Sequence, residues 1–285
     1  MIRILLITCI AFFPFAALTE EDAPPIQLNI LAEEELSIVL PSIIRSYARE
    51  YPVSLNLSFD STAIQVAKIE EGEPADIFIT SSRHALQRLQ QQGRLDTYTA
   101  QHPIAENRLM LAVAAANPLT LDDSESVNLS EKLSDNDTPP AFVVSDADLH
   151  AEGEFAVEVL RALGMATAEE ALLPPSIEES AATGDDVITT LPETRSGIEQ
   201  VARGEAYGIL YATEARRFSS IRQAAQLPES LHAPVRYTVT VVAGDNMNEA
   251  RRLLTFFDSD TVRRLFAEAG FLPVDARRPD ASQDI

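Results

Sequence analysis

The sequence predicts an α/β fold in which helices cover both faces of a sheet. Short apolar or alternating runs switch repeatedly to helical spacing along the chain. Glycine directly follows several helical segments, as at Gly93, Gly164 and Gly204, where it is a typical helix stop. The 285 residues are 46% hydrophobic, which is enough for a large core or for two lobes of ordinary domain size. Alternation of strands and helices is typical of this class.

The first part of the chain, residues 24–107, contains repeated strand–helix units. We expect strands at 28–31, 54–59 and 76–79, and helices at 34–50, from 63 onward, and at 82–92.

A second set of units begins with an apolar strand at 108–114. The regions 122–140 and 174–186 are acidic and rich in turn residues, so we expect surface loops there. The remaining strands are expected at 141–145, 188–190, 206–211 and 237–242, and the remaining helices at 153–163, 195–203, 248–257 and 261–269.

The N-terminus has the pattern of a secretory signal. Arg3 precedes an apolar run from 4 to 18, which has small residues near its end at Ala16 and Ala17. This run is shorter than the roughly 20 residues that span a bilayer, although a short membrane anchor is the alternative. We therefore predict that residues 1–23 are removed. The only cysteine, Cys9, lies inside this segment, so the mature chain would form no disulfide.

The net charge of −22 restricts the possible partners. Such a surface repels nucleic acid and anionic lipid, and it does not attract a dianion from a distance. An oxyanion site would have to work locally, through hydroxyls and aligned dipoles. The chain has no Ser-His-Asp order, phosphate loop or Gly-rich dinucleotide turn, and its four histidines have no metal spacing. We therefore predict neither an enzyme, nor a cofactor, nor a bound metal.

Five segments together resemble the molybdate-binding proteins of ABC importers, a family of type II periplasmic binding proteins. They are Gly-Glu-Pro-Ala-Asp-Ile-Phe at 72–78, the strand at 106–113, Arg-Gly-Glu-Ala-Tyr-Gly-Ile-Leu-Tyr at 203–211, the strand at 233–242 and Phe-Ala-Glu-Ala-Gly-Phe at 266–271.

The resemblance implies a two-lobed fold, each lobe a mixed sheet flanked by helices, with the ligand cleft between the lobes. Lobe 1 would comprise 24–107 completed by 237–285, and lobe 2 would comprise 108–236. The function implied is that of a periplasmic, monomeric solute-binding protein that delivers molybdate or tungstate to a membrane permease.

The same resemblance maps ligand-binding positions onto this chain. The hydroxyl donors of the family fall on Ser61, Thr62 and Tyr211, and a backbone contact falls on Thr194. Neutral donors and helix N-termini can hold a dianion without a counter-cation.

Two further positions depart from the family pattern. Glu35 replaces a serine of the first strand–helix turn, and Glu152 replaces a small residue of the second-lobe turn. An ionised carboxylate is acceptor-only, and a like charge about 4 Å away costs roughly 4 kcal/mol at an effective dielectric of about 20. Three interpretations stay open: the carboxylates point to solvent, they are protonated, or the site takes a cation or an amine. We expect both acids at the cleft entrance.

Other functions are weaker alternatives. Tyr207 and Tyr211 are the residue types of an iron site with paired tyrosines, and Asp146 and Asp148 are spaced like ligands of a hard cation. A ligand-free interaction protein would use the same fold for a non-transport role.

Overall fold

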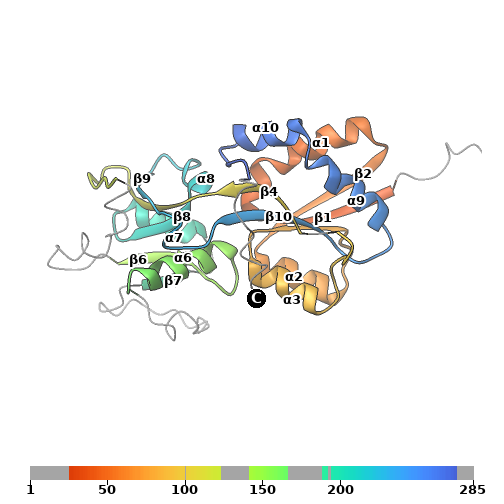
Figure 1. Ribbon diagram of the computed structural model, residues 1–285. Helices are drawn as coiled ribbons and strands as arrows, with labels where there is room; N and C mark the ends of the chain where they lie inside the picture. The colour runs from red at the N-terminus through yellow and green to blue at the C-terminus, as the bar shows by residue number, and fades with distance from the viewer. Residues whose placement is uncertain (1–25, 100, 123–140, 166–187, 192–193, 275–285) are drawn as a thin grey trace, which may run out of the picture.

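The computed structural model describes residues 26–99, 101–122, 141–165, 188–191 and 194–274. The predicted signal segment and most of the two acidic loops lie outside these residues. The described chain folds into two lobes that lie side by side, each built on a five-stranded sheet with helices on both faces (Figure 1). The fold class predicted from the sequence is confirmed.

The sheet of the first lobe is mixed, with the order β2-β1-β3-β10-β4. β1 pairs in parallel with β2 and β3, whereas β10 is antiparallel to both of its neighbours. These strands are β1 (Ile26–Glu33), β2 (Val53–Asp60), β3 (Ile77–Thr80), β4 (His102–Asn107) and β10 (Val235–Val241).

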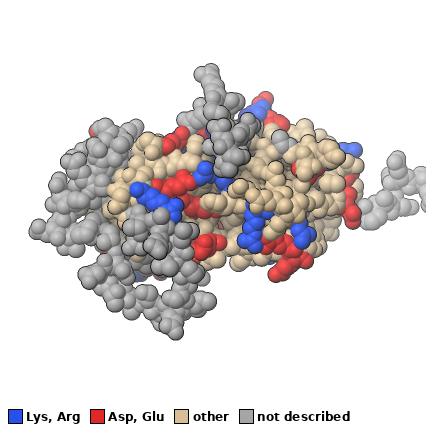
Figure 2. Space-filling view, turned by 60° about the horizontal axis from the view of Figure 1, so that its bottom comes forward, with Lys and Arg blue, Asp and Glu red and all other residues tan. Residues whose placement is uncertain are grey.

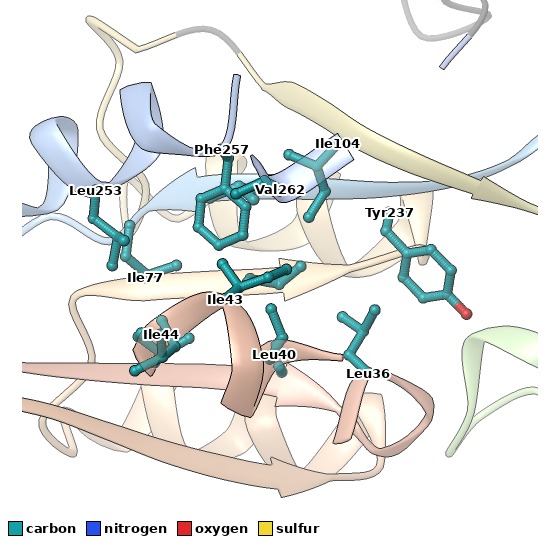
Figure 3. Close-up of a cluster of buried hydrophobic side chains, with 14 of the residues drawn as sticks. Leu36, Leu40, Ile43, Ile44, Ile77, Ile104, Tyr237, Leu253, Phe257 and Val262 are labelled. Carbon is teal, nitrogen blue, oxygen red and sulfur yellow. The ribbon is translucent and has the colours of Figure 1, made fainter. Parts of the chain in front are cut away.

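Helices cover both faces of this sheet. The main apolar cluster packs between one face of the sheet and the helices η2, α1, α9 and α10. Figure 3 shows part of this cluster, including Ile43, Ile77 and Phe257. A smaller apolar cluster packs under α2 and α3. The helices are η2 (Glu34–Ile38), α1 (Leu40–Glu50), α2 (Thr62–Glu71), α3 (Arg83–Gln91), α9 (Met247–Phe256) and α10 (Asp260–Glu268).

The second lobe has the sheet order β7-β6-β8-β5-β9, with α6 on one face and α7 and α8 on the other. Alternate residues of β5 enter the two clusters, Leu111 one of them and Met110 the other, as a strand buried on both faces requires. The elements are β5 (Leu109–Ala114), β6 (Phe142–Ser145), α6 (Ala151–Ala162), β7 (Ile188–Leu191), α7 (Thr194–Ala202), β8 (Tyr207–Tyr211), α8 (Ala212–Ala215) and β9 (Ile221–Gln226).

The chain passes between the lobes at two described places. Arg108 alone separates β4 from β5, although these strands belong to different sheets. The return runs from β9 to β10, and both crossings lie at the middle of the molecule in Figure 1. No described helix is long and apolar enough to pass through a bilayer.

The structure corrects two expectations about the elements. The helix expected at 34–50 is broken at Val39 into a 3-10 turn and α1, because Pro41 lies in the first turn of α1, where its missing N–H is tolerated and its fixed φ favours a helix start. The edge strands β4 and β9 were not predicted; one contains Pro103 and the other is largely polar, so neither alternates clearly.

Candidate functional site: the junction between the lobes

Three helices begin at the junction between the lobes. Ser61 caps α2 and Ser82 caps α3, each accepting a hydrogen bond from a backbone N–H of its helix. From the second lobe, the Ala151 N–H at the start of α6 donates to Thr62 Oγ1 over 3.3 Å. The Ala63 N–H returns a bond to the Leu149 carbonyl over 3.1 Å. Helix N-termini of both lobes therefore converge, and such ends favour negative charge.

Gly153 allows α6 to come this close. A Cβ atom there would lie 2.4 Å from the Ser145 carbonyl oxygen and 2.6 Å from the Ala147 nitrogen. Any larger residue would push the helix away from the end of β6. The glycine thus fixes the position of the preceding residue, Glu152.

Glu33 is the central acid of the first-lobe side. It ends the buried strand β1, is only 2% exposed, and its Oε1 accepts hydrogen bonds from Thr62 Oγ1 at 3.0 Å and from the Ser81 N–H at 3.0 Å. Thr80 Oγ1 also donates to Oε1, and Ser81 Oγ donates to Oε2 at 2.9 Å. All four donors are neutral, and they surround the carboxylate as they would surround any small oxyanion.

Glu152 is the buried acid of the second-lobe side. It is 1% exposed. Its Oε1 accepts from the Tyr211 N–H at 2.6 Å, and its Oε2 accepts from Ser145 Oγ at 2.7 Å. These donors are again neutral.

Phenol and amide groups complete the junction. Tyr211 OH lies 3.0 Å from Ser81 Oγ, so this hydrogen bond joins β8 to the end of β3 across the two lobes. Asn107 Nδ2 donates to Thr213 Oγ1 at 2.8 Å and to Tyr237 OH at 3.3 Å. Figure 3 shows the Tyr237 ring at the margin of the first-lobe core with its hydroxyl pointing away from the apolar side chains.

Burial raises the pKa values of the acids at the junction, and neighbouring carboxylates raise those of Glu35 and Glu152 further. Burial is the main reason that the pKa of Glu33 lies above its ordinary range, and burial raises the pKa of Glu152 to about 7. The pKa of Glu35 is also well above its usual range, through burial of its carboxyl and the charges of Glu33 and Glu152. Glu214 adds a further negative charge and is paired with Arg217 at 2.9 Å. The junction therefore favours protonated carboxyls at a higher pH than free carboxyls do.

A cavity of about 420 Å³ borders this junction. It lies between α2 and α3 of the first lobe and α6 of the second, and Thr62 and Ser82 form part of its wall. Charged contacts cross the lobes beside it: Glu154 binds Ser82 and lies 3.1 Å from His84 Nδ1, and Arg83 pairs with Glu158. Figure 2 faces this side of the molecule, where basic and acidic side chains are mixed rather than separated.

The structure brings four of the six predicted site residues together. Ser61, Thr62, Glu152 and Tyr211 lie at the junction, where Ser61 acts as a helix cap and the other three make the contacts described above. Glu35 is half-buried in the first turn of η2, and the charges of Glu33 and Glu152 contribute to its raised pKa.

The sixth predicted residue, Thr194, is the first residue of α7, which follows β7 in the chain. The last residue of β7, Leu191, accepts a hydrogen bond from the Asp146 N–H.

One expectation about the acids is wrong. Glu152 does not point to solvent and does not lie at the cleft entrance, because its carboxylate is buried and bound by Ser145 and Tyr211. The first of the three open interpretations is thus excluded for this residue.

Sequence reasoning missed Glu33 and the Thr80–Ser81 pair. Glu33 is one of three consecutive glutamates, and only its position directly after the buried run of β1 distinguishes it. Thr80 is likewise the last residue of the fully buried strand β3, and Ser81 follows it directly. Since parallel strands end at one edge of a sheet, this shared position was the available signal.

The metal alternatives find no support in the described residues, which hold no group of three or more metal-ligating side chains suited to an ion. Tyr207 and Tyr211 are the two ends of β8, four residues or about 13 Å apart along a strand, too far to share one ion. The carboxylate of Asp146 accepts the Asp148 N–H at 2.8 Å, a local loop contact.

Comparison with known proteins agrees with this architecture. The chain is 26% identical over 249 residues to the molybdate-binding protein ModA of Haemophilus influenzae, covering 86% of this chain and 89% of the relative. It is 25% identical over 246 residues to ModA of Escherichia coli, covering 86% and 88%.

Among solved structures, the substrate-binding domain of a putative molybdenum ABC transporter from Clostridium difficile shares the fold, with a TM-score of 0.65 at 21% identity over 88% of this chain and all of that one. The model of the family described as bacterial extracellular solute-binding proteins matches residues 28–272. The chain therefore belongs to the bacterial extracellular solute-binding protein family.

Proposed function

We propose that this chain is the solute-binding component of an ABC importer and that it binds a tetrahedral oxyanion, molybdate or tungstate, between its lobes. The observation that carries the proposal is the pair of buried carboxylates, Glu33 and Glu152, each held by neutral O–H and N–H donors. Donors that hold a carboxylate in this way also suit the oxygens of an oxyanion. The two ModA relatives carry the name of molybdate-binding proteins, which supports the same ligand class.

In this proposal the ligand contacts come from both lobes. Ser61, Thr62 and Tyr211 supply hydroxyl groups, and Thr194 supplies a backbone contact near the start of α7. The chain would pass from one lobe to the other at about residues 107/108 and 236/237. The lobes would close on the ligand by a hinge motion at these two crossings. The protein would bind and release its ligand without chemical change, and so would not be an enzyme.

The remaining features of the proposal concern the setting of the protein. Removal of residues 1–23 would leave a periplasmic, monomeric protein that presents its ligand-bound form to a membrane permease. The strongly acidic composition, with a net charge of −22, suits a protein that avoids nucleic acid and anionic membrane surfaces.

A thermal-shift screen tests the ligand class. Purified mature protein is heated with molybdate, tungstate, sulfate, phosphate, divalent metals or an amine, at pH 6 and at pH 8. A ligand at 100 times its dissociation constant stabilises the folded state by about 2.7 kcal/mol, which shifts the melting temperature clearly. We expect molybdate and tungstate to stabilise the protein. Stabilisation only by a metal ion or an amine would assign the site to a cationic ligand, and no stabilisation by any of them would favour an interaction protein.

A further inference from the structure

The two buried carboxylates occupy donors that would also suit an oxyanion at the junction, including the Thr62 hydroxyl of the proposed site. Thr62 Oγ1 and the Ser81 N–H are bound to Glu33, and the Tyr211 N–H is bound to Glu152. A hydroxyl or a backbone N–H carries a single hydrogen to donate. An oxyanion and the chain's own carboxylates therefore compete for the same hydrogens.

Charge makes this competition severe. Molybdate and an ionised carboxylate are both acceptors, so no hydrogen bond can form between them. Like charges in contact repel strongly inside a protein, and a dianion doubles the charge on one side. A protonated carboxyl removes this repulsion and presents an O–H donor to the ligand instead.

Resting on the proposed function, we propose that the oxyanion binds together with protons on Glu33 and Glu152, which change from competing acceptors into hydrogen-bond donors to the ligand. The two acids are then specificity-determining groups of the site, and the ligand class is an oxyanion taken up with accompanying protons.

The surroundings of both acids favour the protonated form. The pKa of Glu33 is raised mainly by burial, and that of Glu152 lies at about 7 for the same main reason, with the charges of Glu214 and Glu33 adding to it. Protonation of Glu152 near neutral pH is therefore inexpensive, and burial makes protonation of Glu33 easier than that of an exposed glutamate.

Two basic groups beside the junction already have acidic partners. Lys68 of α2 is paired with Asp60 at 3.4 Å, and Arg217, which follows α8, is paired with Glu214 at 2.9 Å. The other titratable groups linked by charge to these acids are Glu35 on η2, Glu214 on α8, Tyr211 on β8 and Tyr237 on β10. Asp146 and His150 stand in the turn before α6.

Calorimetry of molybdate binding tests the proposal. The wild-type protein is titrated between pH 6 and pH 8 in two buffers that differ in their enthalpy of ionisation, so that proton uptake appears as a difference in the measured heat. A carboxyl of pKa about 7 is about 90% protonated at pH 6 and about 10% at pH 8, so affinity should fall at least about tenfold over this range. Affinity that is independent of pH, with no buffer-dependent heat, would overturn the proposal.

Isosteric variants identify the groups that take up the protons. Glu33→Gln together with Glu152→Gln keeps the side-chain shape and supplies amide N–H donors without titration. We expect this variant to bind molybdate at pH 8 about as tightly as the wild type does at pH 6, without proton uptake. Glu205→Gln, which changes an exposed acid of the second lobe, is the control and should keep the wild-type pH dependence. If Glu33→Gln/Glu152→Gln keeps it as well, the protons go elsewhere and the proposal fails.

Two outcomes are kept apart by this design. If neither the wild type nor the variant binds molybdate, tungstate, sulfate or phosphate at any pH, the proposed function fails. If the wild type binds an oxyanion without proton uptake, only the present inference fails. Circular dichroism reports whether the double variant folds, and where it does not, the buffer-dependent heat of the wild type alone decides the question.

Discussion

Replacing Gly153 by alanine tests how closely α6 must approach the end of β6. The new methyl group would lie 2.4 Å from the Ser145 carbonyl oxygen, 2.6 Å from the Ala147 nitrogen and 2.7 Å from the Asp146 carbonyl carbon. All three are backbone atoms that cannot rotate aside, so the helix would have to move. Overpacking costs about 1–3 kcal/mol, and rigid neighbours place this change near the upper value. The better helix propensity of alanine returns about 1 kcal/mol, which leaves a net loss of about 2 kcal/mol.

Thermal denaturation measures this loss. One kcal/mol shifts the melting temperature by about 2–4 °C for a protein of about 150–250 residues, so we expect a drop of about 4–8 °C. Movement of α6 would also displace Glu152 from Ser145 and from the Tyr211 N–H, so oxyanion affinity and its pH dependence should change together.

A matched glycine provides the control. Gly244 also lacks a side chain, but a Cβ atom there would meet nothing within 4 Å. Gly244→Ala should therefore change stability by no more than about 0.5 kcal/mol. If Gly153→Ala melts at the same temperature as Gly244→Ala, the close approach of α6 to β6 is not required, and the argument that glycine fixes the position of Glu152 is refuted.

Three further predictions concern the junction. Thr62→Ala and Tyr211→Phe should each weaken oxyanion binding about ten- to a hundredfold in calorimetry, since a hydrogen bond to a charged group is worth about 1.5–3 kcal/mol; unchanged affinity in both would remove these hydroxyls from the site. Glu35→Ser combined with Glu152→Gln, which keeps a donor at position 152, should tighten molybdate binding at pH 8 by about tenfold or more, because removal of about 1.4 kcal/mol of repulsion has that effect, and an unchanged dissociation constant would make the acids bystanders. The pKa of Glu152 in the folded protein is about 7, above its ordinary 4.5, so the stabilising effect of its protonated carboxyl is complete below pH 4.5 and is lost as the pH rises to 7. This loss lowers the free energy of unfolding by about 3 kcal/mol. Melting temperatures of the wild type and Glu152→Gln should therefore diverge across this pH range, and a constant difference between them would contradict the shift.

The fold was largely predictable because local patterns and long-range structure agree. The buried parallel strand β3 is a short apolar run, and β1 is apolar at most of its buried positions. The helices α2 and α3 begin at serine caps and are followed by glycines such as Gly93, whose φ of +68° favours that residue. The edge strands β4 and β9 were missed because an edge strand tolerates proline and polar residues, which remove the alternating pattern.

The candidate site was only partly predictable from the sequence. Ser61, Thr62 and Tyr211 could be found because each stands in a recognisable turn or strand segment. Glu33 could not be separated from Glu34 and Glu35 by composition or spacing. Its role depends on contacts with Thr80 and Ser81, which lie 47 and 48 residues away and become neighbours only when β1 pairs with β3. The direction of the Glu152 side chain likewise depends on packing between α6 and β8.

The position of a bound tungstate ion would show directly whether the ligand lies at the junction between the lobes. Crystals of the mature protein are grown with tungstate at pH 6, and the anomalous scattering of tungsten locates the ion independently of the rest of the map. We expect a single strong peak between the lobes, within hydrogen-bonding reach of Thr62 Oγ1, the Ser81 N–H and the Tyr211 hydroxyl. The carboxyls of Glu33 and Glu152 should be turned to donate to the oxygens of the ion. A peak confined to the cavity between α2, α3 and α6, or no peak in crystals that contain tungstate, would contradict it.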